Sequence, residues 1–202
     1  MVGVPTVTSI SWQSAVGGRS EQMSGIDYDC AGCGERHRGA DGTEDNPWPL
    51  IDLLHPEPVL QLNRWERLTR VRSTGEVCLL DNGSEVECYV RGFLSLPVKG
   101  EEALLVYSPW AQLSQDDYLD LAEHWERPGF RGEYQGMLAN ELPGSPGSLS
   151  VPVQVRAHGL MPPLIIPELT GGHGLWREER EGITRKEAEL RVRSVLLEEA
   201  EL

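Results

Sequence analysis

The sequence predicts an α+β protein with a mainly antiparallel sheet, helices packed on one face of that sheet, and an N-terminal CxxC knuckle. Three observations support this prediction. Apolar and polar residues alternate over residues 86–98, which is typical of a half-buried strand. The tetrapeptide Asp81-Asn82-Gly83-Ser84 precedes this run and is a strong hairpin signal. Ser114 with Asp117 and Thr184 with Glu187 have the spacing of capping boxes, so each pair opens a helix.

Three consecutive strands are expected to form a meander, at residues 77–80, 86–98 and 103–113. Gly92 interrupts the apolar series of the second strand, where we expect a bulge or a bend. A three-residue loop would place Cys78 and Cys88 directly opposite each other on one face. We expect both to act as small apolar core residues, with metal binding as the alternative.

The remaining elements follow from helical spacing and from alternation. Residues 59–70 place Leu62, Trp65 and Leu68 at helical core spacing, so that the tryptophan is expected inside. In the last helix, Ala188, Val192 and Val195 should face inward. Further strands are expected at residues 151–157 and 164–169, and Pro152 favours an edge strand or a bulge.

Size and charge limit the classes of partner. The chain has 202 residues, which we divide into a disordered leader (1–24) and one domain (25–202) with a knuckle-like segment at 28–38. The formal net charge of −14 disfavours nucleic acid and anionic membranes. There is no long apolar run and no secretory signal pattern, so we expect reduced thiols and a cytoplasmic location.

A candidate metal site lies near the start of the chain. Cys30 and Cys33 have the two-residue spacing of a zinc knuckle, and His37 is close enough in sequence to be a third ligand. A structural zinc ion takes four ligands, so Cys78, Cys88 or a histidine such as His55 would complete the site. The alternative is a cysteine-bearing turn without metal. A redox dithiol is less favoured because no βαβ pattern follows.

Several blocks spread along the chain resemble one bacterial family. The residues concerned are Cys30, Cys33, Gly34, His37, Cys78, Arg91, Gly92, Leu96, Pro97, Val98, Trp110, Leu113, Ser114, Gly136, Leu138, Asn140, Leu142, Pro143, Gly144, Pro146, Leu149, His173, Leu175 and residues 180–184. Their order and spacing resemble the bacterial domain of unknown function number twenty-one ninety-nine, over roughly residues 28–197. This family has no established activity, so the resemblance implies a shared fold alone.

Two classes of function remain open. The favoured hypothesis is a binding or interaction module for an unknown protein or small molecule, with a possible structural zinc. The alternative is a hydrolase-like enzyme with a site around Arg91, Asn140 and His173, in which the loop histidine would act as a general base. Asn140 is also expected to bind backbone in the loop 142–147. The sequence contains no GxSxG, Walker A, HExxH or dinucleotide-binding motif.

Overall fold

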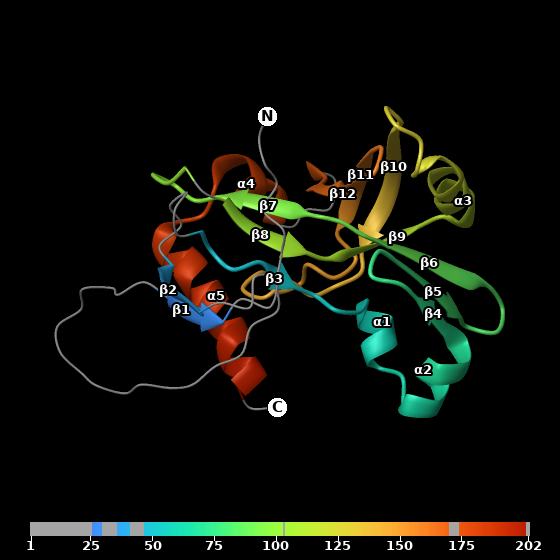
Figure 1. Ribbon diagram of the computed structural model, residues 1–202, viewed down its shortest axis with the longest axis horizontal. Helices are drawn as coiled ribbons and strands as arrows, with labels where there is room; N and C mark the ends of the chain where they lie inside the picture. Colours follow the sequence, from blue (N-terminus) through green and yellow to red (C-terminus); the bar gives the residue numbers. More distant parts are fainter. Residues whose placement is uncertain (1–25, 30–35, 41–46, 103, 170–173, 201–202) are drawn as a thin grey trace.

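The protein has a mixed α+β fold with mostly antiparallel sheets and few helices (Figure 1). The computed structural model describes residues 26–29, 36–40, 47–102, 104–169 and 174–200. The predicted leader, Cys30, Cys33 and His173 therefore lie outside the described residues. Among the described helices, none is long and apolar enough to cross a membrane.

A seven-stranded sheet forms the centre of the fold. Its strands run in the order β12-β11-β10-β9-β6-β5-β4, and every neighbouring pair is antiparallel. The bounds are β4 (Val71–Ser73), β5 (Val77–Asp81), β6 (Val86–Arg91), β9 (Trp110–Leu113), β10 (Arg131–Leu138), β11 (Pro152–His158) and β12 (Met161–Pro167). Pro152 is the first residue of β11 and pairs with Met137, and because β11 has a neighbour on each side, the edge strand expected there is wrong. The irregularity of this strand lies further on, between Arg156 and His158. A first-residue proline is tolerated because its missing N–H lies at the end of the ladder.

Two smaller sheets complete the strands of the described fold. One has the order β3-β8-β7, with β3 (Ile51–Asp52) parallel to β8 (Leu104–Ser108) and β7 (Leu94–Pro97) antiparallel to β8. The other is the hairpin of β1 (Ile26–Asp29) and β2 (Arg36–Ala40).

Each of the two long predicted strands is divided between two sheets. Residues 86–98 form β6 and β7 with a break at Gly92, and residues 104–113 form β8 and β9 with a break at Pro109. The breaks lie side by side, because the Gly92 N–H donates to the Pro109 carbonyl at 3.1 Å. A Cβ on Gly92 would lie 2.5 Å from the Pro163 carbonyl oxygen, so only glycine fits here. The predicted bend is confirmed.

Five helices complete the described fold: α1 (Glu57–Leu60), α2 (Arg64–Arg70), α3 (Gln115–His124), α4 (Leu175–Glu181) and α5 (Arg185–Ala200). Both predicted capping residues are confirmed, since Ser114 accepts from the Asp117 N–H at 3.1 Å and Thr184 from the Glu187 N–H at 3.2 Å. Ala188 and Val192 of α5 are buried as expected.

The helices do not share one face of the sheet. Tyr118 of α3 packs against the core cluster that contains Val90, whereas Val59 of α1 packs in the cluster that contains Tyr89. Neighbouring residues of a strand point to opposite faces, so α1 and α3 cover opposite faces of β6 (Figure 1). The one-face arrangement expected from the sequence therefore does not hold at this end of the molecule.

Two further expectations need correction. Cys78 is opposite Tyr89, and Cys88 is opposite Leu79, because the hairpin loop contains one residue more than expected. Both cysteines are buried core residues as predicted, but their side chains point to opposite faces. Trp65 and Leu68 are not in the core: they are 74% and 71% exposed.

Candidate functional site

A small hollow lies where the chain passes between the two larger sheets. Its volume is about 180 Å³. Five segments that are distant in sequence line it: β3 with the residue before it, the turn between β4 and β5, the β6–β7 break, the end of β8 and the start of β12. The lining residues are Leu50, Asp52, Gly75, Glu76, Arg91, Gly92, Phe93, Ser108 and Pro162. We call this hollow the Arg91 cleft.

Arg91 is the last residue of β6 and supplies the positive charge of the cleft. Its guanidinium forms an ion pair with Asp52, and these side chains are only 20% and 21% exposed. Nη1 donates to the Gly75 carbonyl at 3.3 Å, whereas the buried Nε–H has no hydrogen-bond partner. Burial lowers the pKa of Arg91, although a guanidinium remains charged at any physiological pH. The arginine is therefore held in place without using all its donors.

Trp110 forms the wall behind Arg91. Its ring lies 5.9 Å from the Arg91 guanidinium carbon and is almost fully buried. The indole Nε1–H donates to the Leu53 carbonyl at 2.7 Å, which ties β9 to the segment that follows Asp52. Trp110 thus positions both members of the Arg91–Asp52 pair, one through its ring and the other through the backbone.

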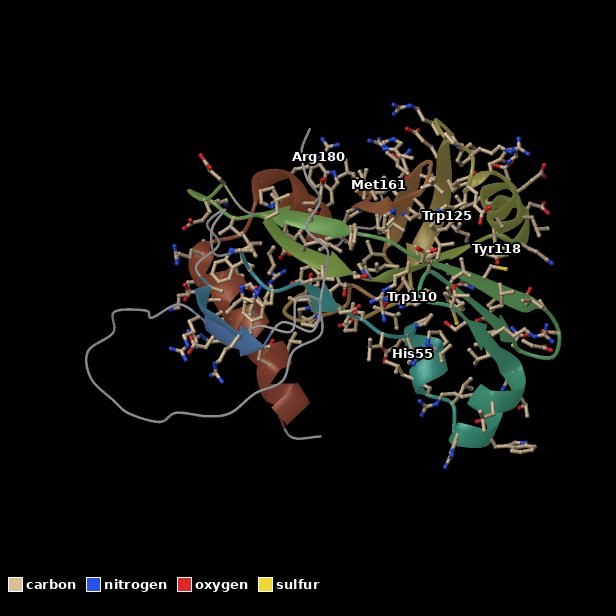
Figure 2. The ribbon with its side chains drawn as sticks, viewed as in Figure 1. His55, Trp110, Tyr118, Trp125, Met161 and Arg180 are labelled. Atoms are coloured by element: carbon tan, nitrogen blue, oxygen red, sulfur yellow. The ribbon has the colours of Figure 1, made fainter. Side chains whose placement is uncertain are left out.

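Asn140 holds the segment that follows Asp52 against β9. Its Oδ1 accepts from the Trp110 backbone N–H at 2.8 Å, and its Nδ2 donates to the His55 carbonyl at 2.8 Å. Figure 2 shows Trp110 and His55 in this region, between β9 and α1. Asn140 binds backbone as expected, but not within the loop 142–147. Because both ends of its amide are used, Asn140 is a positioning residue and does not offer its side chain to a ligand.

The predicted site residues are thus only partly brought together. Arg91 lies in the cleft, Asn140 lies behind it, and His173 is outside the described residues. His37 is in β2, where its ring stacks on Tyr28 with centroids 4.9 Å apart. Within the described part of the chain, no group of three or more His, Cys, Asp or Glu residues could hold a metal ion.

Asp52, Glu76 and Ser108 also line the cleft and are not predicted from the sequence. No local pattern marks them, because Asp52 follows a segment of irregular sequence and Ser108 occupies a strand position. Ser108 is 4% exposed. A strand break next to Arg91 was the only available signal, since breaks with glycine often mark a close approach of backbone or ligand.

Arg191 of α5 is buried and has a different environment from that of Arg91. It donates to Glu178 at 3.0 and 3.1 Å and to Glu187 at 2.9 Å. Burial raises the pKa of the neighbouring Tyr107 to about 12. This cluster joins α4 to α5, and its charges are satisfied within the protein. We therefore interpret it as a structural network that holds the two helices together.

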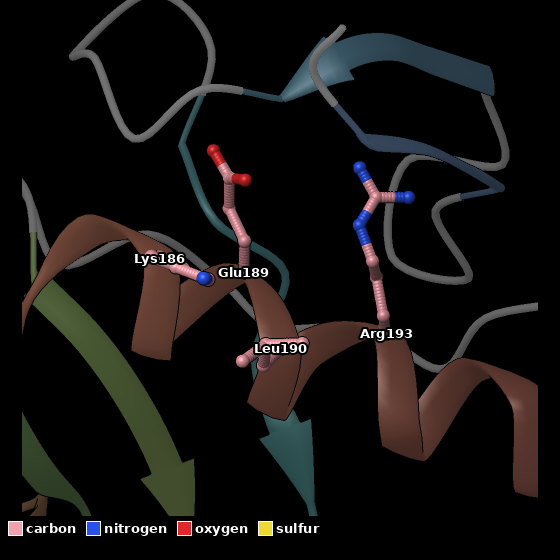
Figure 3. A pocket seen from close by; sticks show the side chains of 4 residues that line it. All are labelled: Lys186, Glu189, Leu190 and Arg193. Atoms are coloured by element: carbon pink, nitrogen blue, oxygen red, sulfur yellow. The ribbon is translucent and has the colours of Figure 1, made fainter. Parts of the chain in front are cut away.

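Another hollow of about 170 Å³ lies on α5, lined by Lys186, Glu189, Leu190 and Arg193 (Figure 3). Glu189 already accepts from Arg185 at 3.1 Å. All four lining residues come from one helix, so polar groups from different elements do not converge there. The Arg91 cleft is the better candidate site.

Comparison with known proteins gives a family and no function. No curated protein and no solved structure matches the chain. One family model, described as "Uncharacterized protein conserved in bacteria (DUF2199)", matches residues 29–183 and confirms the resemblance seen in the sequence. Of the residues that support this resemblance, Arg91 and Gly92 line the cleft, whereas Trp110 and Asn140 lie behind it. The chain belongs to this bacterial family of uncharacterised proteins.

Proposed function

We propose that the protein is a binding module that holds a small zwitterionic ligand, such as a free amino acid, in the Arg91 cleft. One observation supports this proposal above all. Charges of both signs, from the Arg91–Asp52 ion pair and from Glu76, converge from three segments on one small hollow.

The chemistry of the lining fits such a ligand. Arg91 has an unpaired Nε–H, and the planar guanidinium is the group that best matches a carboxylate. Asp52 and Glu76 would attract an ammonium group. Phe93 and Pro162 add an apolar wall for a short side chain. The volume is smaller than the roughly 300–1,000 Å³ of typical ligand pockets, so the ligand must be small.

Binding is favoured over the hydrolase alternative for a geometric reason. Both ends of the Asn140 amide are bonded to backbone, so one of the three residues in that alternative does not face the cleft. Ser108 contributes the hydroxyl of the described lining, and no lining residue is a histidine or lysine that would activate it.

The test is a thermal-shift screen of the free amino acids, one at a time, followed by calorimetry. A ligand at about a hundred times its Kd stabilises the folded state by about 2.7 kcal/mol, which is a measurable rise in Tm. Arg91→Lys keeps the charge but loses the two parallel N–H donors of the guanidinium, so it should abolish the rise in Tm. Arg180→Lys is the matched control, because Arg180 also lies over a tryptophan, Trp176 at 5.3 Å, but outside the cleft.

Blocked ligands sharpen this test. The N-acetyl and methyl-ester forms of any ligand found should each bind more weakly, because each loses one of the two charges. If no amino acid raises Tm, or if Arg91→Lys responds as the natural protein does, the proposed function fails.

A structural zinc ion at Cys30, Cys33 and His37 belongs to the same proposal. His37 pairs with Tyr28 across the β1–β2 hairpin, and the two cysteines fall in the sequence that connects these strands. Stacking on Tyr28 uses the ring face of His37, whereas a metal binds in the ring plane, so the two are compatible. Bound zinc would cross-link the two strands.

Metal analysis of the purified protein tests the zinc proposal. We expect about one zinc per chain, lost in Cys30→Ser and Cys33→Ser and retained in Cys78→Ala, since Cys78 lies in the core. Zinc-free protein with freely reactive Cys30 and Cys33 would contradict it. We also propose a cytoplasmic location, where thiols stay reduced and can bind the metal.

A further inference from the structure

Helix α2 has an apolar surface that nothing in the described protein covers. None of its seven residues is buried, and Trp65 and Leu68 are 74% and 71% exposed. An ordinary surface helix turns such residues toward the core. Here Leu62, just before the helix, packs on the core instead. We call the surface formed by Arg64, Trp65, Arg67 and Leu68 the α2 face.

This helix is well ordered in spite of its exposure. Asn63 and Glu66 form a reciprocal capping box, with both hydrogen bonds at 3.0 Å. Arg70 donates through Nε to the Asp81 carbonyl at 2.7 Å, which ties the end of the helix to β5. The α2 face is therefore presented on a fixed helix at the edge of the molecule (Figure 1).

The charge of α2 is opposite to that of the whole protein. The helix contains three arginines and one glutamate, against a chain charge of −14. Glu66 pairs with Arg70 at 3.7 Å, whereas in the described part of the chain no acidic side chain pairs with Arg64 or Arg67. The exposed tryptophan and leucine are thus flanked by available positive charge. Tryptophan and arginine are the residues most enriched among binding hot spots.

We infer that the α2 face docks an acidic segment of a partner protein that carries apolar side chains. The arginines would pair with its carboxylates, while Trp65 and Leu68 would bury its apolar residues. A nucleic acid is less suited, because the net charge repels a long polyanion and Leu68 offers nothing to a phosphate or a base edge. A second copy in a twofold contact is less suited, because two α2 faces of the same positive charge would repel each other.

A designed peptide tests this inference without knowledge of the natural partner. The probe is a short labelled peptide with leucines at i, i+4 and i+7 and glutamates elsewhere, and binding is followed by fluorescence anisotropy. We expect the natural protein to bind it, and Trp65→Ala with Leu68→Ser to weaken binding at least about tenfold. Arg64→Glu with Arg67→Glu should weaken it further and remove its dependence on salt.

Two control variants make the result specific. Leu119→Ala removes a leucine of α3 that is 56% exposed and should leave binding unchanged. Arg91→Lys should also leave it unchanged, which separates this surface from the ligand cleft. None of the altered α2 residues is buried, so only a small fall in Tm is expected, from the loss of the Arg67–Leu62 hydrogen bond in Arg67→Glu, and a cooperative unfolding transition would show that the variants are folded.

Three outcomes would overturn the inference. The first is equal peptide binding by the natural protein and the Trp65→Ala, Leu68→Ser variant, or no binding by either. The second is self-association that increases with concentration and is lost in this variant, which would assign the α2 face to a second copy. The third is binding of a labelled oligothymidine that is lost in Arg64→Glu, which would assign it to single-stranded nucleic acid.

Discussion

Trp110 and Trp65 each lie close to an arginine, yet their surroundings are opposite. Trp110 is buried at the junction of two sheets, where its backbone and its indole nitrogen are both hydrogen-bonded. Trp65 lies on a short helix and is 74% exposed. Tryptophan therefore positions a site in one region of this protein and is available for binding in another. Burial and hydrogen bonding, not residue type, separate the two.

Removal of the two indole rings should show the largest difference. Trp110→Ala should lower the free energy of unfolding by about 3–5 kcal/mol, because it leaves a large cavity and an unpaired Leu53 carbonyl. Trp65→Ala should change it by less than about 0.5 kcal/mol. Denaturant unfolding of both variants measures the difference. Similar losses would show that Trp65 contributes to the core.

The two asparagines beside these tryptophans should differ in the same direction. Asn140→Ala leaves the Trp110 N–H and the His55 carbonyl unpaired inside the protein, so we expect a loss of about 2–4 kcal/mol. Asn63→Ala removes only an exposed cap of α2, which should cost about 0.5–2 kcal/mol. Chemical denaturation of the pair checks this order, and a larger effect at Asn63 would contradict it.

Two glycines that line the cleft provide a narrower test. Gly92→Ala would place a methyl group 2.5 Å from the Pro163 carbonyl, so we expect a loss of about 1–3 kcal/mol and a weaker ligand site. Gly75→Ala meets nothing within 4 Å and should be neutral. Thermal unfolding of both variants distinguishes a close backbone contact from a general need for glycine. Equal stability of the two variants would argue against the close packing of β12 on the break.

Alkaline pH should destabilise the core cluster around Trp110, with a smaller effect than the substitutions above. Burial raises the pKa of Cys78 from its ordinary value of 9.0, and it also raises the pKa of Tyr89, which lies in the same cluster as Trp110. Both pKa values are higher in the folded than in the unfolded protein, so the unfolded chain loses these protons first. The free energy of unfolding is therefore highest below about pH 9 and falls as the pH rises further. The slope is at most about 1.4 kcal/mol per pH unit for each group. Unfolding free energies that stay constant between about pH 8 and pH 10.5 would contradict this.

Local sequence signals predicted much of the fold correctly. Turn residues and capping boxes act within a few residues, so the hairpin after β5 and the starts of α3 and α5 could be placed from the sequence. Gly92 was identified as a bend for the same reason. Loop length was harder to predict, and an error of one residue reversed the relative orientation of Cys78 and Cys88.

The site could be predicted only in part. Arg91 and Asn140 were recognised, but their contacts were not, because Asp52 and His55 lie far from them in sequence. The position of Trp65 was missed since helical spacing shows which residues share a face and not what that face meets.

Alternation, turn chemistry and capping thus determined the class of fold, the bend at Gly92 and the burial of both core cysteines. Tertiary structure alone decided that β6 and β7 belong to different sheets, that Asp52 pairs with Arg91, and that α2 remains uncovered. The physical reason is the range of the interactions. Backbone conformation depends on neighbouring residues, whereas a cleft and an exposed face depend on which distant segments pack together.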